Sequence, residues 1–429
     1  MFKTLKNAFS QADIRKKLLF VVFIVILYRI GCAIPVPFLS ADVMNQFRTF
    51  TGGSVFEIMS LMSGTAFAQA NLFALSISPY INSSIIMQLL CTAIPALENM
   101  SKEEDGRKKI SQITRVVTVA IALVTSYGYY MMLKQANCLM PGRDGWFEAV
   151  VIVACYTAGS SLIMWLGEKI NENGIGNGIS IILFVNIVSS APTTIMTMFT
   201  GMTTSQISTI IFPILTLLLA SAMVIFVIFI THSERRLSVQ YAKRVVGRKM
   251  YGGQSSTLPL KLNMAGVMPV IFANSILALP GTLGMIFPAK AGSFWEGFLK
   301  AFSYDSWLYA VLFLALIICF SYFYIAISFN PIEVANNLKK QGGFIPGIRP
   351  GKPTSDYITK ILNKVTLMGA FFLAVIAVIP LVANIISGGG FSYVAFSGTS
   401  VIIIVGVALE TYREIEAQMT MRHYKGFLE

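Results

Sequence analysis

Residues 306–332 read SWLYAVLFLALIICFSYFYIAISFNPI, a run of 27 residues without one charged side chain. A helix needs about 20 mostly apolar residues to cross the hydrocarbon core of a bilayer, so this run predicts one transmembrane helix. The whole chain has the same character, because 55% of its 429 residues are hydrophobic and only 12% are charged. A soluble chain typically carries about twice that charged fraction. The composition therefore excludes a soluble protein, including a soluble nucleic-acid binder, and indicates a polytopic membrane protein.

The other spans are predicted from the remaining gaps between charged residues. The first span covers about residues 18–34, and single spans are expected between residues 115 and 134, 148 and 168, and 261 and 290. Two long gaps, 172–234 and 364–410, are expected to hold two spans each, divided between Pro192 and Gly201 and at 388–390 respectively. With one more span in the gap 57–98, these gaps predict ten transmembrane helices.

The 40 uncharged residues between Glu57 and Glu98 have two different parts. Residues 73–94 are strongly apolar and predict a full span, whereas residues 56–71 contain Ser, Gly and Gln and predict a half-helix. Irregular backbone at membrane depth is tolerated only inside protein or beside a water-filled cavity. The half-helix therefore indicates a pore or binding site, although a plain loop outside the membrane fits the composition equally well.

Basic residues are distributed unequally between the alternate loops of this ten-span arrangement. The face that includes both termini carries 27 of the 33 lysines and arginines, and the opposite face carries five. By the positive-inside rule, the first face and both termini are cytoplasmic. The net charge of +13 therefore indicates, above all, how the chain is oriented in the membrane. Thirteen of the basic residues lie in the two long cytosolic loops, 231–265 and 330–364.

Both long loops mix basic residues with Gly, Pro and apolar residues, a pattern typical of ordered protrusions. Basic clusters at a membrane most often bind anionic lipid or fix topology. Ordered, paired loops of this kind also suit the docking of a large anionic partner, such as a ribosome or a motor ATPase. Composition alone leaves both interpretations open.

Residues that carry catalysis or bind metals are scarce. The two histidines, His232 and His423, lack ligand spacing, and no Gly-x-x-x-x-Gly-Lys-Ser/Thr phosphate loop occurs. The glycine-rich run 174–178 lacks the context of a dinucleotide site and predicts a sharp entry to the next span. We expect no metal, no cofactor and no enzymatic activity.

A secondary transporter with broken helices is the alternative, but the buried acidic residues that such transporters use are almost absent from the predicted spans. An intramembrane enzyme would need catalytic residues that the chain lacks.

Four segments resemble the bacterial SecY family (SecY/Sec61-alpha), whose members are central subunits of a protein-conducting channel. They are PYINSSIIMQLL (79–90), GIGNGISI (174–181), NMAGVMP (263–269) and FIPGIRPG (344–351). The resemblance covers nearly the whole chain. It implies an all-α polytopic membrane fold, with ten transmembrane helices in two inverted, pseudo-symmetric halves of five around an hourglass pore. The halves would be residues 1–200 and 201–429, and no internal repeat is visible in the sequence itself.

The resemblance also implies the sites. An apolar constriction ring, which dewets and blocks ions, is expected at Ile77, Ile81, Ile179, Leu183, Ile271 and Ile403. Many relatives carry isoleucine at the position of Leu183. Because leucine has the same size and apolar character, we expect this difference to leave gating intact. A plug within residues 56–71 is expected to use Phe56, Ile58, Met59, Leu61, Met62, Ser63 and Gly64. A lateral gate, between the second and third spans and the seventh and eighth, is expected at Asn82, Gln88, Asn274 and Leu279. Docking of motor or ribosome is expected at Arg244, Arg248, Lys249 and Arg349.

The implied activity is the passage of unfolded secretory polypeptides across a bacterial cytoplasmic membrane, with lateral release of apolar helices into the bilayer. The implied partners are the SecE and SecG subunits, the SecA ATPase, the ribosome, polypeptides that carry a signal sequence, and anionic lipids. The signal sequence and either SecA or the ribosome would open the channel.

Overall fold

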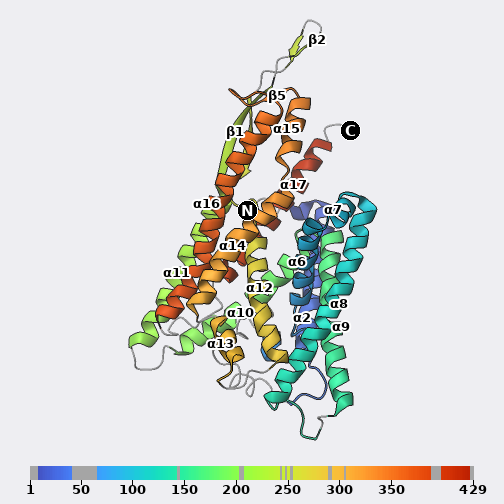
Figure 1. Ribbon diagram of the computed structural model, residues 1–429, viewed down its shortest axis with the longest axis vertical. Helices are drawn as coiled ribbons and strands as arrows, with labels where there is room; N and C mark the ends of the chain where they lie inside the picture. The colour runs from blue at the N-terminus through green and yellow to red at the C-terminus, as the bar shows by residue number, and fades with distance from the viewer. Residues whose placement is uncertain are drawn as a thin grey trace.

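The computed structural model describes residues 8–40, 65–142, 145–201, 207–241, 244–246, 249–251, 255–287, 292–303, 306–387 and 398–425. Most of these residues are helical (Figure 1). The helices are α2 (Ala12–Ala33), α5 (Thr65–Ala68), α6 (Ser78–Ala93), α7 (Pro95–Lys102), α8 (Glu104–Gln135), α9 (Trp146–Asn173), α10 (Gly178–Gly201), α11 (Ile207–His232), α12 (Met268–Ile286), α13 (Phe294–Ala301), α14 (Trp307–Ser328), α15 (Pro331–Lys340), α16 (Lys352–Ile386) and α17 (Gly398–Lys425). The strands are β1 (Glu234–Tyr241), β2 (Arg244–Val246), β3 (Lys249–Tyr251), β4 (Ser255–Lys261) and β5 (Gly343–Phe344).

The long helices run side by side in an elongated bundle (Figure 1). Helices α2, α6, α8 and α9 pack together on one side, and α11, α14 and α16 lie on the other. Helix α12 lies between the two groups and contacts α6, α8 and α14, while α17 packs against α10, α11 and α16. One hydrophobic cluster includes side chains from both groups, such as Ile24 of α2 and Ile317 of α14. The described bundle therefore shares a single main core.

Several helices have the length and composition of membrane spans. Among the described residues, six helical segments pass this test, in α8, α9, α11, α12, α14 with α15, and α16, and the pair α6–α7, bent by 105°, brings the number to seven. Helices α2, α10 and α17 coincide with three further predicted spans, but α2 and α17 carry several charged residues, such as Lys17 and Glu414. The chain is a multi-pass membrane protein, and the count of ten spans stays a prediction.

The second predicted span becomes helical only at Ser78, so its predicted start at residue 73 is wrong. Residues 69–77 form turns instead, with a positive φ at Ser76. This irregular segment is buried, and the Asn71 side-chain amide donates to the carbonyl of Cys32 at 2.7 Å. Non-helical backbone is thus enclosed by protein, which is the condition for its presence at membrane depth.

The gap 172–234 holds two helices as predicted, α10 and α11, but α10 continues through Pro192 and ends only at Gly201, so Pro192 does not break it. Proline lacks an N–H and removes one hydrogen bond from the turn before it. In that turn the hydroxyls of Ser189 and Ser190 donate to the carbonyls of Asn186 and Ile187 at 2.8 and 2.9 Å. The carbonyl that loses its helical partner is that of Val188, four residues before the proline, so these two hydroxyl bonds lie beside the interrupted position and do not replace the lost bond.

The two long basic loops form a small β-sheet, which corrects the all-α class to a mostly helical one. Strand β1 pairs antiparallel with β4 and β5 in the order β4-β1-β5, and β2 pairs with β3 in a separate hairpin. This hairpin projects from one end of the bundle (Figure 1). The signal is an alternation along β1, where Leu237 and Val239 are buried between exposed neighbours. Val239 packs against Ile345 and Ile358, so the expectation of ordered loops is confirmed for their described residues.

Candidate pore and lateral gate

The predicted ring residues come together from four helices. Ile77 and Ile81 at the start of α6, Leu183 of α10, Ile271 of α12 and Ile403 of α17 are buried in the main hydrophobic cluster, and Ile179 is partly buried against it. The residues are far apart along the chain, and the fold brings all six to one core. Their role as an aliphatic constriction stays a prediction.

A small cavity lies among these side chains. It has a volume of about 20 Å³ and is lined by Leu183, Ile187, Ile271, Asn274, Thr399, Ser400 and Ile403. Such a volume holds about one water molecule. Sequence reasoning missed Ile187, Thr399 and Ser400. Ile187 lies four residues after Leu183 and therefore on the same helix face. This spacing could have predicted it as a lining residue.

The turn between α9 and α10 positions two of the ring residues. Gly176 has a φ of +90°, a conformation that glycine adopts without strain. Gly178 lies so close to α9 that an added Cβ would be 2.0 Å from the carbonyl oxygen of Gly167. Asn177 caps α10, because its Oδ1 accepts from the backbone N–H of Ile179 at 3.1 Å. The interpretation of this motif as a sharp entry to a helix is confirmed.

Gly178→Ala is expected to separate α9 from α10, because the new methyl group would overlap the Gly167 carbonyl. Overpacking of this kind costs about 1–3 kcal/mol, so thermal unfolding in detergent should begin at a clearly lower temperature. Gly297→Ala is the matched control, since an added Cβ at Gly297 meets nothing within 4 Å. Equal melting temperatures for the two variants would contradict the close packing.

A buried polar network ties α2 and α10 to the irregular segment before α6. The Tyr28 hydroxyl donates to Oδ1 of Asn186 at 2.7 Å, and the Asn186 amide donates to the Ser76 hydroxyl at 3.1 Å. Arg29, next to Tyr28, donates to the backbone carbonyl of Val185. Because Ser76 directly precedes the first predicted ring residue, this network fixes the backbone at the edge of the ring.

Helix α12 faces α6 and α8, where the lateral gate is predicted. The approach is close at Gly128 of α8, where an added Cβ would lie 2.9 Å from Cγ1 of Ile286 on α12. Asn274 of α12 is buried and lines the cavity, whereas Asn82 and Gln88 of α6 are half-buried. Sequence reasoning missed Gly128, although a small residue in an apolar helix is a known signal of close helix packing.

The four predicted gate residues do not form one continuous polar seam. Gln88 donates through Nε2 to the hydroxyl of Ser84 on its own helix at 3.3 Å. Leu279 is 41% exposed on the surface of α12. The gate role of these residues therefore stays a prediction, and its clearest structural support is the contact of α12 with α6 and α8.

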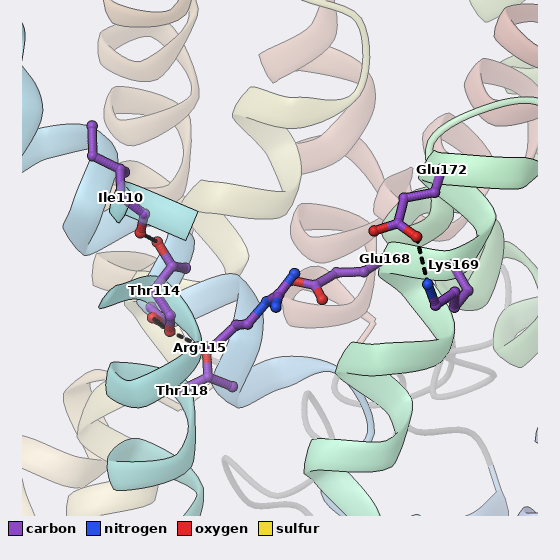
Figure 2. Close-up of polar contacts among 8 residues, drawn as sticks. Ile110, Thr114, Arg115, Thr118, Glu168, Lys169 and Glu172 are labelled. Atoms are coloured by element: carbon purple, nitrogen blue, oxygen red, sulfur yellow. Dashed lines mark hydrogen bonds and ion pairs between the residues drawn. The ribbon is translucent and has the colours of Figure 1, made fainter. Parts of the chain in front are cut away.

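Polar contacts join α6, α8 and α9, and Figure 2 shows those around Thr114 and Arg115 of α8. The carbonyl of Thr114 on α8 accepts from the hydroxyls of Ser83 on α6 and Thr118 on α8, at 2.8 and 2.7 Å. Arg115 of α8 donates through Nε to Oε1 of Glu168 on α9 at 2.9 Å, and the Glu168 side chain is only 13% exposed (Figure 2). A charge-assisted bond in a partly dehydrated site is stronger than a neutral one. These contacts hold the three helices together as one unit beside α12.

A groove of about 790 Å³ opens beside this unit, between α6, α7 and α8 on one side and α14 on the other. Charged residues, including Lys102 and Arg107, line it together with apolar ones such as Met87 and Ile327. Lys102 also pairs with Glu98 at 2.8 Å along α7. The groove is amphipathic, and sequence reasoning missed it because its walls come from separate helices.

The predicted docking residues gather at the sheet end of the molecule. Arg244 and Lys249 lie on the paired strands β2 and β3, and Arg248 lies outside the described residues. Arg349 is exposed, and its backbone carbonyl accepts from the Thr354 hydroxyl at 2.8 Å. Because β5 pairs with β1, the two basic loops reach the same end of the bundle (Figure 1).

The predicted plug residues, Phe56 to Gly64, all lie outside the described residues. Within the part of the chain that is described, no group of three or more His, Cys, Asp or Glu side chains is placed to hold a metal ion.

Solved structures with the same fold define the class of this protein. "The structure of a protein conducting channel" matches with a TM-score of 0.66 at 17% identity, over 94% of this chain and 92% of that chain. Sec61 in the canine ribosome-channel complex from the endoplasmic reticulum matches with a TM-score of 0.62 at 16% identity, over 94% and 92%. This chain therefore has the fold of the protein-conducting channels.

Sequence comparison gives the family. The family profile described as SecY matches residues 71–412. The protein translocase subunit SecY of Streptomyces galbus is 40% identical over 445 residues, which cover 100% of both chains. That of Corynebacterium glutamicum is 40% identical over 446 residues, 99% of each. The chain belongs to the SecY family.

Proposed function

We propose that this chain is the channel subunit of a bacterial protein translocase. It lies in the cytoplasmic membrane with ten spans, in two inverted halves, and with both termini in the cytosol. Unfolded secretory polypeptides pass through a pore that six aliphatic side chains close at rest. Apolar helices leave the pore sideways into the bilayer. Their exit lies between two pairs of helices: α6 and α8 form one side, and α12 and α14 form the other.

The observation that carries this proposal is that the six ring residues lie in or against one apolar core, and that Leu183, Ile271 and Ile403 from three helices line a cavity of about 20 Å³ there. A narrow constriction lined by aliphatic side chains excludes hydrated ions, and no charged side chain lines this cavity to bind a sliding polypeptide. The full-length relatives that match this chain are translocase subunits, which supports polypeptides as the cargo.

Lateral release is supported by the way the helices are grouped. Helices α6, α8 and α9 share hydrogen bonds and the Arg115–Glu168 ion pair, whereas α12 contacts α6 and α8 through apolar side chains of two hydrophobic clusters. An apolar signal sequence gains roughly 0.3–0.6 kcal/mol per aliphatic residue in the membrane. Insertion of the signal sequence between α12 and the group formed by α6, α8 and α9 would therefore favour the open state of the channel over the closed one.

The proposed partners are SecE, SecG, the SecA ATPase, the ribosome and anionic lipids. The exposed Arg349 and the basic hairpin, which projects from the bundle, suit an acidic or RNA-rich partner. Two of the matching folds were solved with ribosomes, canine Sec61 and the yeast Ssh1 complex bound to the 80S ribosome. A further match is described as having a plug domain that stabilises the closed channel, and residues 56–71 are the proposed plug here.

Reconstitution tests this function directly. The chain, assembled with SecE and SecG in lipid vesicles, receives SecA, ATP and a polypeptide with a signal sequence. We expect the polypeptide to become protected from added protease only when ATP is present, because only transported chain lies inside the vesicle. The same polypeptide without its signal sequence is the control. Absence of protection with an assembled complex and an active SecA would overturn the proposal.

A further inference from the structure

Helix α13 is a short helix at the end of the bundle opposite the β-sheet, between α12 and α14 (Figure 1). Its sequence is FWEGFLKA, and none of its residues is fully buried. Phe294 is 90% exposed, which is the largest exposure among the large hydrophobic residues of the described chain. An aromatic ring in contact with water is unfavourable, so this surface needs a partner.

The helix is divided into a polar and an apolar face. Glu296 and Lys300, one turn apart, form an ion pair at 2.7 Å, and Glu296 also accepts from the N–H of Gly292 at 2.7 Å. The Lys300 ammonium, together with this backbone bond, lowers the pKa of the Glu296 carboxyl. At about 100° per residue, Phe294 and Phe298 lie on the side opposite this ion pair. One face is thus charged and the other aromatic.

Contacts with α12 fix how this helix lies. The indole Nε1 of Trp295 donates to the carbonyl of Phe287, just beyond the end of α12, at 2.8 Å. The Leu299 side chain lies 3.0 Å from the position that a Cβ on Gly284 would occupy. Trp295 also stacks on Phe298 with 5.3 Å between ring centroids. The edge of the apolar face nearest α12 is therefore occupied, and Phe294 points away from it.

The ends of the two spans that α13 connects also carry exposed apolar side chains. Phe287, beyond the end of α12, is 63% exposed, and Trp307, at the start of α14, is 55% exposed. The next exposed residues along these helices, Leu283 and Leu308, are apolar as well. Tryptophan at the end of a span marks the boundary between lipid tails and headgroups. Helix α13 contacts both α12 and α14, so it lies at the same level as these two span ends.

We propose that α13 binds the lipid interface of the leaflet opposite the β-sheet. Phe294 and Phe298 enter the boundary between headgroups and acyl chains, and Glu296 and Lys300 stay in water. The occupant is lipid rather than another protein subunit, because α13 contacts the two spans that it connects, and Trp307 and Phe287 at their ends are exposed where the bilayer interface is expected. Through Trp295 and Leu299, the lipid surface then sets the depth of the end of α12.

Fluorescence quenching tests the placement in the assembled complex with SecE and SecG, in phosphatidylcholine vesicles. The four tryptophans of this chain are replaced by phenylalanine. A single reporter tryptophan is then introduced as Phe294→Trp or, on the polar face, as Lys300→Trp. Phosphatidylcholine brominated in the acyl chains should quench the reporter at position 294 at least about twofold more than the one at 300, since bromine quenches only on contact with buried rings. Acrylamide in the water should show the reverse order.

Equal quenching of the two reporters by acrylamide would overturn the proposal. Quenching by brominated lipid that is no stronger at position 294 than at position 300 in the assembled complex would also overturn it, because another subunit would then cover this face.

Thiol labelling gives a second measurement that keeps all four tryptophans. Phe294→Cys and Lys300→Cys are compared for their reaction with a water-soluble maleimide, after subtraction of the rate of the unsubstituted complex. We expect the thiol at position 300 to react about tenfold faster, because a thiolate forms readily in water and poorly among lipid tails. Equal rates would contradict a lipid-bound apolar face.

Discussion

Replacing both Ile81 and Ile271 with serine is expected to make the resting channel conduct ions. Both side chains are 98% shielded from solvent and lie in the cluster that closes the proposed pore. Each substitution removes most of an aliphatic side chain and adds a hydroxyl group, so the constriction becomes wider and able to bind water. A hydrated constriction no longer gates by dewetting. We expect the resting conductance in planar bilayers to rise about tenfold or more.

A matched substitution separates gating from general damage. Ile152 of α9 is also fully buried, but it belongs to a different hydrophobic cluster. Ile152→Ser should destabilise the protein by a similar amount for each residue changed, roughly 2–5 kcal/mol, without raising the conductance. If the double variant conducts no more than the unsubstituted closed channel, the assignment of the ring is wrong. If Ile152→Ser conducts equally well, loss of stability explains the leak.

Sequence reasoning located most helices because charge and hydropathy act on each segment separately. The gaps between charged residues place α8, α9, α12, α14 and α16 correctly, since a charged side chain within the hydrocarbon core is costly for any helix. The same gaps cannot show how a segment begins. The turns before Ser78 are as apolar as the helix that follows, and only burial of Asn71 and Ser76 makes them acceptable.

The site residues were harder to predict for a different reason. Each ring residue is an aliphatic side chain in an aliphatic helix, so composition does not distinguish Ile271 from an isoleucine that faces lipid. Only the resemblance to a family supplied the register. Contacts between helices, such as Arg115 with Glu168 and Gly128 with Ile286, depend on the rotation and depth of two helices together. Tilt and rotation are set by packing against neighbours, which a single segment does not encode.

Arg349→Glu is expected to slow transport driven by SecA about tenfold or more, because surface charges steer and hold a charged partner. The side chain of Arg349 is exposed, and the residue's backbone carbonyl accepts from the Thr354 hydroxyl. An exposed substitution without lost contacts changes stability by about 0.5 kcal/mol or less. The variant should therefore insert and assemble with SecE normally, and the rate of protease protection at fixed SecA concentration is the measurement.

The control is Lys108→Glu on α8, whose side chain is 77% exposed and lies 3.5 Å from Asp105. It changes the net charge by the same amount but lies away from the β-sheet, so it should transport at nearly the normal rate. Raising the salt concentration should narrow the difference between Arg349→Glu and the unsubstituted complex, because salt screens exposed charges beyond about 10 Å. Normal transport by Arg349→Glu, in a complex that contains SecE, would contradict the proposal that SecA docks at this end of the molecule. An equal loss with Lys108→Glu would make net charge, not Arg349, the cause.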